Sequence, residues 1–311
     1  MTSTGNTDKE ISAADRGRVL GLLNQAALDK GLAPEIEPMA SGITNRSFLV
    51  TLSEQQVVVR LSTELTAVLG IDRNKEMYLQ RIGASLGVAP ATLYFDSSRG
   101  DNITRFIAAP ADKSRWSNEG VRAQEVGRLL KTLHSAELDS KQQFLFDPVD
   151  DIIHWAIVIK GSPIAEQASE SVADIPGLFE KFMSGDESNV LCHNDLDPGN
   201  ILFDDSRGWL IDWEYAGVGD YRFDLASYAR HLSLDGRQEL LNSYYVTDKP
   251  SLSDLNNWVA CFRGWTAVWA LAQHVLREES DFDYYTYASE IFSDLENVKA
   301  LETVTLRREG K

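Results

Sequence analysis

The segment at residues 190–224 constrains the fold of this chain more than any other, because short apolar runs alternate in it with polar turns. The runs ILF and WLI in its middle have the length of short strands and are separated by turn-forming residues. A strand–turn–strand unit returns the chain to the end of the pair from which it started. We therefore expect Asp195 and Asn200, which precede the unit, to lie close to Asp212, which follows it.

The polar residues of this segment follow the spacing of a kinase catalytic loop. The run HNDLDPGN from His193 to Asn200 matches H-R-D-x-x-x-x-N with asparagine in place of arginine, and DWE from Asp212 stands where kinases carry D-F-G. In this interpretation Asp195 accepts the proton of the attacking hydroxyl, and His193 orients the loop by hydrogen bonds. Asn200 and Asp212 hold Mg²⁺, a hard cation that prefers oxygen ligands.

HNDLDPGNILF followed by LIDWEYAGVGDYRFDLA resembles the aminoglycoside phosphotransferase and choline/ethanolamine kinase superfamily, and most of all its bacterial choline kinase-like members. The resemblance is strongest here and recurs weakly through most of the chain. It implies an α+β, two-lobed, protein-kinase-like fold with a small five-stranded antiparallel N-lobe and a larger, mainly helical C-lobe. We expect residues 1–107 to bind the nucleotide and residues 108–311 to carry catalysis and acceptor binding, with ATP and Mg²⁺ as cofactors.

The turn at residues 41–46 joins the first two of five predicted strands, and a kinase fold places this turn over the ATP phosphates. It contains one glycine only, so the prediction rests on backbone N–H groups and on the side chains of Ser41, Thr44 and Asn45. GITNRSFLV also resembles the G-x-T-N segment of choline kinases. An ordinary hairpin turn is the alternative.

Arg60 lies on the third predicted strand, where protein kinases have their phosphate-binding lysine. The arginine departs from the aminoglycoside enzymes but agrees with choline kinases, and it can grip phosphate oxygens in bidentate fashion. Glu76, on a helix predicted over 71–86, is placed to pair with Arg60. A surface ion pair for Arg60 and a solvated Glu76 are the alternatives. Phe106 begins the expected hinge, whose backbone would bind adenine.

The last predicted helices carry aromatic residues on one face. RGWTAVWALAQ followed by FDYYTYA resembles the region in which choline kinases cage a quaternary ammonium by cation–π attraction. Trp269 and Tyr287 are the best-matched positions, with Trp265 and Tyr284 as further members. Such a stripe is also typical of a helix core, so cage and core both remain open.

Two other polar residues are expected to act through structure. His134 ends a helix that Ser117 is predicted to cap, and we interpret it as structural rather than as a ligand. Asp224 is expected to brace the catalytic loop by accepting backbone N–H bonds, with a helix N-cap as the alternative.

Composition limits the classes of partner and compartment. The net charge of −17 would repel phosphate backbones, which disfavours nucleic-acid binding, and it would attract a cationic substrate. No apolar run approaches a membrane span. Two cysteines are too few for a disulfide framework, so we expect a cytoplasmic protein with both thiols buried. The oligomeric state stays open.

These observations predict a small-molecule kinase that transfers the γ-phosphate of ATP to a hydroxyl, with choline or ethanolamine as the preferred acceptor. Thiamine and aminoglycosides are alternative acceptors within the superfamily. A pseudokinase or nucleotide-binding scaffold is disfavoured by the intact Asp195, Asn200 and Asp212. A metal-dependent hydrolase is disfavoured because the sequence lacks clustered histidine ligands.

Overall fold

The computed structural model describes residues 11–28, 31, 33–39, 45–53, 55–63, 69–138, 144–183, 189–277, 280 and 282–309, with side chains described up to residue 296. The chain forms two compact units. Unit 1 comprises Met1–Ser117 and Asp195–Ala216, and unit 2 comprises Asn118–Asn194 and Gly217–Lys311.

Unit 1 extends beyond the lobe boundary that the sequence suggested at residue 107. Residues 108–117 belong to it, and so does the later segment that carries Asp195 and Asp212. A backbone hydrogen bond connects this later segment to the earlier part of unit 1, because the N–H of Leu210 donates to the carbonyl of Val88 at 2.7 Å. The expected division of labour between two lobes stays a prediction.

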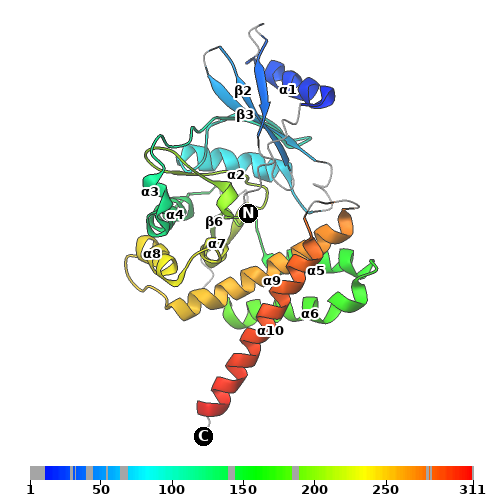
Figure 1. The fold of residues 1–311 in the computed structure, drawn as a ribbon, viewed down its shortest axis with the longest axis vertical. Coiled ribbons are helices and arrows are strands. Elements are labelled where there is room, and N and C mark those ends of the chain that lie inside the picture. The colour runs from blue at the N-terminus through cyan, green and yellow to red at the C-terminus, as the bar shows by residue number, and fades with distance from the viewer. Residues whose placement is uncertain are drawn as a thin grey trace, which may run out of the picture. The chain divides into compact units, whose positions relative to one another are not determined.

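The sheet of unit 1 has five antiparallel strands in the order β1-β2-β3-β5-β4, which confirms the predicted five-stranded sheet (Figure 1). In chain order the strands are β1 (Glu35–Pro38), β2 (Asn45–Thr51), β3 (Gln56–Ser62), β4 (Thr92–Asp96) and β5 (Asp101–Arg105). The register sets Arg60 on β3 opposite Ser47 on β2 and Asn102 on β5. Arg60 therefore lies on a central strand, not on an edge.

Two helices flank the sheet in unit 1. Apolar residues at helical spacing predict a helix over 11–32, but α1 (Ala13–Gln25) is capped by Ser12 and ends earlier, just before Ala27 takes a positive φ of 54°. Its apolar face packs on β3 and β5. The shared core consists of Val19, Leu22, Leu23, Ile36, Phe48, Val50, Val57, Val59, Leu61 and Ile103. Helix α2 (Arg73–Ser85) begins at its N-cap Asp72 and packs against β4.

The remaining part of unit 1 carries the catalytic motif. A short 3₁₀ turn η2 (Pro198–Asn200) leads into the hairpin of β7 (Ile201–Phe203) and β8 (Gly208–Leu210). A separate short helix, α3 (Ser114–Ser117), lies against this hairpin, and the Trp116 ring stacks on Phe203. The predicted cap at Ser117 is therefore wrong: Ser117 ends α3, and the next helix is capped by Asn118.

Unit 2 is mainly helical, as predicted. Its elements are α4 (Glu119–His134), α5 (Pro148–Lys160), α6 (Ala165–Phe182), β6 (Asn189–Cys192), β9 (Gly217–Asp220), α7 (Tyr221–Ala229), α8 (Leu234–Tyr244), α9 (Leu252–Leu276) and α10 (Tyr284–Glu309). Helix α9 contacts α5, α6, α7 and α10 (Figure 1), which explains why apolar residues occur around much of its circumference.

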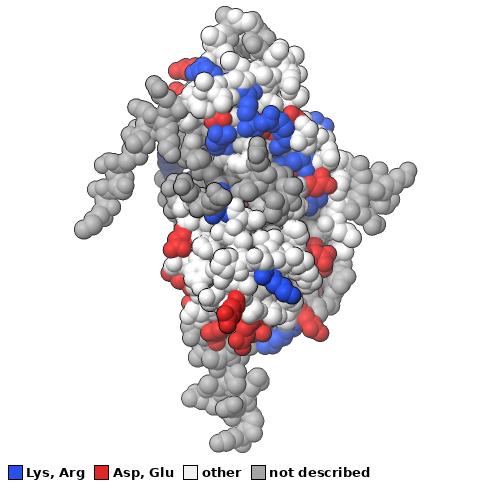
Figure 2. Space-filling view, turned by 90° about the vertical axis from the view of Figure 1, so that its right-hand side faces the viewer, with Lys and Arg blue, Asp and Glu red and all other residues white. Residues whose placement is uncertain are grey.

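Both cysteines are buried and free, as expected from their apolar surroundings. A search of the described helices finds none with the length and apolarity of a membrane span. On the face drawn in Figure 2, Lys and Arg side chains gather in one region, and a group of Asp and Glu side chains lies apart from it. On this face, charges of opposite sign are therefore partly separated.

Candidate active site

The backbone that leads into the motif is held by a buried carboxylate in unit 2. Asp224, on α7, accepts the N–H groups of His193 at 2.9 Å and Asn194 at 2.6 Å. This confirms its expected bracing role, and the N-cap of α7 is Asp220 instead. His134 contacts the Asp224 carboxylate at 3.0 Å through Nε2 and the Tyr244 hydroxyl at 2.8 Å through Nδ1, and its structural role stays a prediction.

Asn194, which is held by Asp224 and precedes Asp195 in the chain, has a strained backbone. Its φ is 66°, in the left-handed region that residues other than glycine seldom occupy. Asn tolerates this conformation better than most residues, including the arginine that kinases carry here. The two N–H bonds to Asp224 over-determine the turn and offset its strain.

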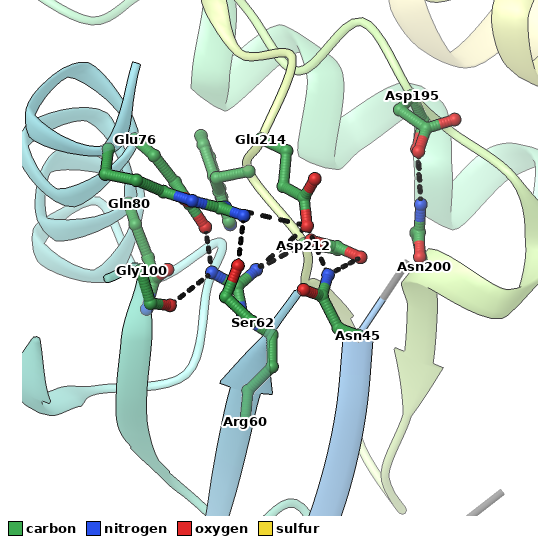
Figure 3. A network of polar contacts seen from close by, with 12 residues as sticks. Asn45, Arg60, Ser62, Glu76, Gln80, Gly100, Asp195, Asn200, Asp212 and Glu214 are labelled. Atoms are coloured by element: carbon green, nitrogen blue, oxygen red, sulfur yellow. Dashed lines mark hydrogen bonds and ion pairs between the residues drawn. The ribbon is translucent and has the colours of Figure 1, made fainter. Parts of the chain in front are cut away.

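Asp195 and Asn200 are joined directly in unit 1. The Asn200 Nδ2 donates to the backbone carbonyl of Asp195 at 3.0 Å and to its carboxylate Oδ2 at 2.8 Å. Figure 3 shows that the Asn200 amide oxygen points away from Asp195. The two hydrogen bonds hold Asp195 in place, and the Asn200 amide oxygen is directed away from it.

Asp212 is brought to the same loop by a backbone bond, because the N–H of Ile211 donates to the carbonyl of Asn200 at 3.0 Å. The prediction that Asp195, Asn200 and Asp212 lie close together was based on this return of the chain through the β7–β8 hairpin. The φ of Asp212 is 64°, a second left-handed residue within the motif. Strain of this kind gathers at functional sites.

The electrostatic surroundings of Asp212 favour a bound cation. Burial is the main reason that the pKa of Asp212 is raised well above that of an ordinary carboxyl. The Glu214 carboxylate raises this pKa further, and the Arg60 guanidinium lowers it. The Glu76 and Asp195 carboxylates also raise the pKa. A cation at this point would therefore relieve repulsion among carboxylates.

Arg60 is the centre of a buried polar network (Figure 3). Its guanidinium forms ion pairs with Glu76, which is fully buried, and with Asp212 at 2.7 Å. Arg60 therefore pairs with Glu76 as predicted, in the interior and not at the surface. Although burial alone lowers its pKa, the Glu76, Asp212 and Glu214 carboxylates raise the pKa of Arg60 above its ordinary value. Arg60 is therefore charged at every accessible pH.

Asn45, at the start of β2, reaches the same network. Its Nδ2 donates to the Glu214 carboxylate and lies 3.5 Å from Asp212 Oδ2. Asn45 thus links the strand that follows the 41–46 turn to the segment that carries Asp212. Ser41 and Thr44, the other two residues predicted in that turn, lie outside the described residues.

Two charged residues of this network were not recognised in the sequence. Glu214 is 4% exposed and follows Asp212 by two positions, and Arg73 is 7% exposed and precedes Glu76 by three positions on α2. The spacing of Arg73 and Glu76 was a detectable signal, since side chains at i and i+3 meet on a helix. Nothing in the sequence indicated that both are buried.

The donor set fits Mg²⁺. Carboxylate and amide oxygens from Asp195, Asn200 and Asp212 lie in one unit, and hard oxygen ligands suit this cation. The crowding of carboxylates that raises the pKa of Asp212 is the second indication. Asp212 and Asn200 would hold the ion by their oxygens, as in the kinase interpretation.

The expected hinge begins where β5 ends. The N–H of Phe106 donates to the carbonyl of Gln56 at 3.3 Å, so this group already extends the sheet. Of the two backbone groups of Phe106, the carbonyl is the better candidate for adenine. Its role in nucleotide binding stays a prediction.

The aromatic residues of unit 2 occupy two kinds of environment. Trp265 is 4% exposed, packs beside Trp155 and Phe223, and donates from Nε1 to Asp151 at 3.2 Å. Trp269 is half-buried, and its ring meets the edge of Tyr284 with centroids 5.8 Å apart. Core packing thus accounts for Trp265, whereas Trp269 keeps a partly accessible ring.

A residue that sequence reasoning missed extends the second group. Phe282 is 42% exposed, and its ring contacts Tyr284 and the half-buried Tyr287. The Arg277 guanidinium lies 5.8 Å from the centre of the Tyr284 ring, within the range of cation–π attraction. Tyr284 itself is 2% exposed, so in the group formed by Trp269, Phe282, Tyr284 and Tyr287 it is a packing residue, and the other three members keep partly accessible rings.

Comparison with known proteins decides the family. Residues 35–253, well over half of the chain, match the phosphotransferase enzyme family. The chain belongs to this family. Protein LicA of Haemophilus influenzae is 28% identical to this phosphotransferase over 208 residues, which cover 65% of the chain but only 60% of LicA. Probable choline kinase 2 of Arabidopsis thaliana is 23% identical over 302 residues, with 84% of each protein covered.

The fold of this phosphotransferase has a solved counterpart. A choline/ethanolamine kinase family protein from Mesorhizobium loti superposes with a TM-score of 0.73 at 22% identity, covering 91% of this chain and 94% of the other. This likeness, together with the five-stranded antiparallel sheet, confirms the protein-kinase-like fold.

Proposed function

We propose that this phosphotransferase transfers the γ-phosphoryl group of ATP to the hydroxyl of a small cationic amino alcohol, choline or ethanolamine. The observation that carries the proposal is the meeting of Asp195, Asn200 and Asp212 in one unit with the buried Arg60–Glu76 pair. Kinases use this combination of base, metal ligands and phosphate-binding cation. The names of the relatives supply the acceptor class.

In the proposed reaction Asp195 takes the proton of the acceptor hydroxyl. The hydroxyl oxygen forms a bond to the γ-phosphorus, the bond from that phosphorus to the β–γ bridging oxygen breaks, and ADP leaves. Asn200 supports this step by holding the Asp195 carboxylate through its Nδ2 at 2.8 Å. The chain contributes position and charge rather than covalent chemistry.

Arg60 grips the phosphate oxygens in the proposed complex. Its contact with Asp212 at 2.7 Å has to be exchanged for phosphate, while its contact with Glu76 is retained. Asp212 and Asn200 are the proposed Mg²⁺ ligands, and bound Mg²⁺ supplies neutralising charge on the phosphates. Asn45, whose Nδ2 lies 3.5 Å from Asp212 Oδ2, is proposed to take part in nucleotide binding.

The rings of Trp269, Phe282 and Tyr287, with the buried Tyr284 packed against Trp269, form the proposed binding site for the acceptor's ammonium group. A methylated cation gives up its hydration readily and presents its charge to ring faces. Half-buried Trp269 and Tyr287 suit this role better than Trp265, which is 4% exposed. We therefore expect choline to be preferred to ethanolamine.

One screen tests the proposal. ATP consumption is measured with choline, ethanolamine, thiamine and kanamycin as separate acceptors, with a no-acceptor control that reports plain ATP hydrolysis. Turnover with choline or ethanolamine supports the proposal. Turnover with thiamine or kanamycin alone would reassign the acceptor, and ATP binding without turnover on any acceptor would indicate a pseudokinase.

A further inference from the structure

Arg73 occupies an unusual place for a cation. It is the first residue of α2, where the positive end of the helix dipole opposes a positive charge. It is also 7% exposed, although arginine is seldom buried without partners. Neither helix stability nor solvation explains its position, so the explanation must come from its contacts.

The Arg73 guanidinium links three separate elements of unit 1. Its Nη1 lies 2.5 Å from Oε2 of Glu76 on α2 and 3.6 Å from Oε1 of Glu214, which follows β8. Its Nη2 donates to the Ser62 hydroxyl at the end of β3. One side chain thus ties the helix, the strand that carries Arg60 and the segment that carries Asp212.

The charge balance of the network explains why the contacts of Arg73 matter. Glu76, Glu214 and Asp212 face two arginines, and Arg60 lies within 4 Å of all three carboxylates. When Arg60 turns toward phosphate, Glu214 would lose its nearby counter-charge unless a second cation stayed in place. A buried carboxylate without a partner is strongly unfavourable. Arg73 is positioned to remain beside Glu214 when Arg60 turns toward phosphate.

We propose that Arg73 is a positioning residue of the nucleotide site: it holds Glu76 and Glu214 so that Arg60 can exchange Asp212 for phosphate. This inference rests on the proposed kinase function. Arg73 touches neither nucleotide nor acceptor in this scheme, and it acts through Arg60.

An independent feature of the chain supports the proposal. Gly100, in the turn between β4 and β5, has a φ of 84°, and a Cβ placed on it would lie 2.8 Å from Cζ of Arg73. Its carbonyl accepts a hydrogen bond from Arg60 Nη2 at 3.1 Å. Gly100 therefore leaves room for the Arg73 guanidinium, and its carbonyl orients the Arg60 guanidinium.

The test uses the full chain and three variants. Arg73→Gln removes the charge, Arg73→Lys keeps a charge but cannot contact Glu76, Glu214 and Ser62 together, and Gly100→Ala displaces the guanidinium without changing any charge. Arg128→Gln is the matched control, since the Arg128 side chain is 56% exposed and pairs with Glu125 (i,i+3) outside the network. Each variant is assayed for MgATP affinity by calorimetry, for melting temperature, and for kcat and both KM values.

We expect Arg73→Gln to lower MgATP affinity and kcat by about 10- to 100-fold. This is the usual effect of losing a residue that holds a ligand-binding side chain in place. The acceptor KM should not change. Arg73→Lys should recover part of the loss, Gly100→Ala should reproduce it in part, and Arg128→Gln should match the wild type. If Arg73→Gln fails to fold, the Lys and Gly100 variants decide the question.

Two results would overturn the inference. Folded Arg73 and Gly100 variants with wild-type MgATP affinity and kcat, even at a lower melting temperature, would show that Arg73 only stabilises the fold. A wild-type protein that does not bind MgATP would overturn the proposed function together with the inference, and the calorimetry distinguishes this outcome from the first.

Discussion

Asp212 carries two unfavourable features. Its backbone is left-handed, with a φ of 64°, and burial and a neighbouring carboxylate raise its pKa. A residue selected for stability alone would avoid both. The same features are useful in a metal ligand, because a bound cation offsets the repulsion and a strained backbone aims the carboxylate.

Asp212→Asn should therefore separate stability from binding. Asn keeps the shape, tolerates the left-handed backbone and removes a charge that the nearby carboxylates repel, so we expect stabilisation on the order of 1 kcal/mol. Nucleotide affinity should lose its dependence on Mg²⁺, because the amide is a weaker metal ligand. Thermal unfolding and nucleotide titration with and without Mg²⁺ check both parts. An unchanged Mg²⁺ dependence would exclude Asp212 as a ligand.

At this scale, sequence reasoning found the residues that belong to a linear motif and missed those that depend on burial. Asp195, Asn200 and Asp212 lie within one short segment, so their spacing alone indicated a common site. Arg73 and Glu214 differ from ordinary surface residues only in being 7% and 4% exposed. Burial of this kind depends on packing between segments that are distant in sequence.

At the scale of elements, α2 makes a tight contact with the segment that carries Asp212. Trp213, which follows Asp212, is 1% exposed, and a Cβ on Gly83 of α2 would overlap its indole ring. The glycine therefore lets the helix approach the tryptophan closely. This contact and the Arg73 bridge to Glu214 hold the two segments in register.

Gly83→Ala should destabilise the protein by about 1–3 kcal/mol through overpacking against Trp213. Gly21→Ala on α1 is a matched control, since nothing lies within 4 Å of a Cβ there. Replacing a helical glycine without steric conflict should stabilise by about 0.5–1 kcal/mol. Urea unfolding of both variants measures the difference. Equal effects of the same sign would contradict the close contact.

Helix α9 allows a similar comparison between two tryptophans one turn apart. Trp265→Ala should cost about 3–5 kcal/mol of stability, because it empties a core position. Trp269→Ala should instead raise the acceptor KM, by roughly 2- to 30-fold for a lost cation–π contact of 0.5–2 kcal/mol, and leave the ATP KM unchanged. Steady-state kinetics with parallel melting curves check this. A folded Trp269→Ala variant with normal choline kinetics would remove Trp269 from the site.

The elements themselves were predictable where their signals were local. Alternating or continuous apolar runs predicted the five strands of the sheet, and Gly87 marked the end of the helix predicted over 71–86, which in the structure begins later, after its N-cap Asp72. Strand β9 (Gly217–Asp220) was not predicted, since its sequence GVGD contains two glycines and forms a strand only by pairing with β6. Helices α5 and α6 were recognised only in part, because Pro176 interrupts the pattern of α6.

At the scale of the whole molecule, the catalytic motif divides between two compact units. His193 and Asn194 are braced by Asp224 in unit 2, while Asp195, Asn200 and Asp212 belong to unit 1 with Arg60. The sequence suggested one boundary at residue 107 because the chain changes there from strands to helices. It could not indicate that a segment far along the chain returns to unit 1, since that return depends on backbone bonds such as Leu210 to Val88.

The central claim is that Asp195 serves as the base in phosphoryl transfer to an amino alcohol. The most direct test measures phosphocholine formation from ATP by the wild type and by Asp195→Asn, together with MgATP affinity of both. We predict that the substitution lowers kcat by about 10²- to 10⁴-fold, the usual contribution of a general base, and leaves MgATP affinity nearly unchanged. Near-wild-type turnover by a folded Asp195→Asn variant would contradict the account.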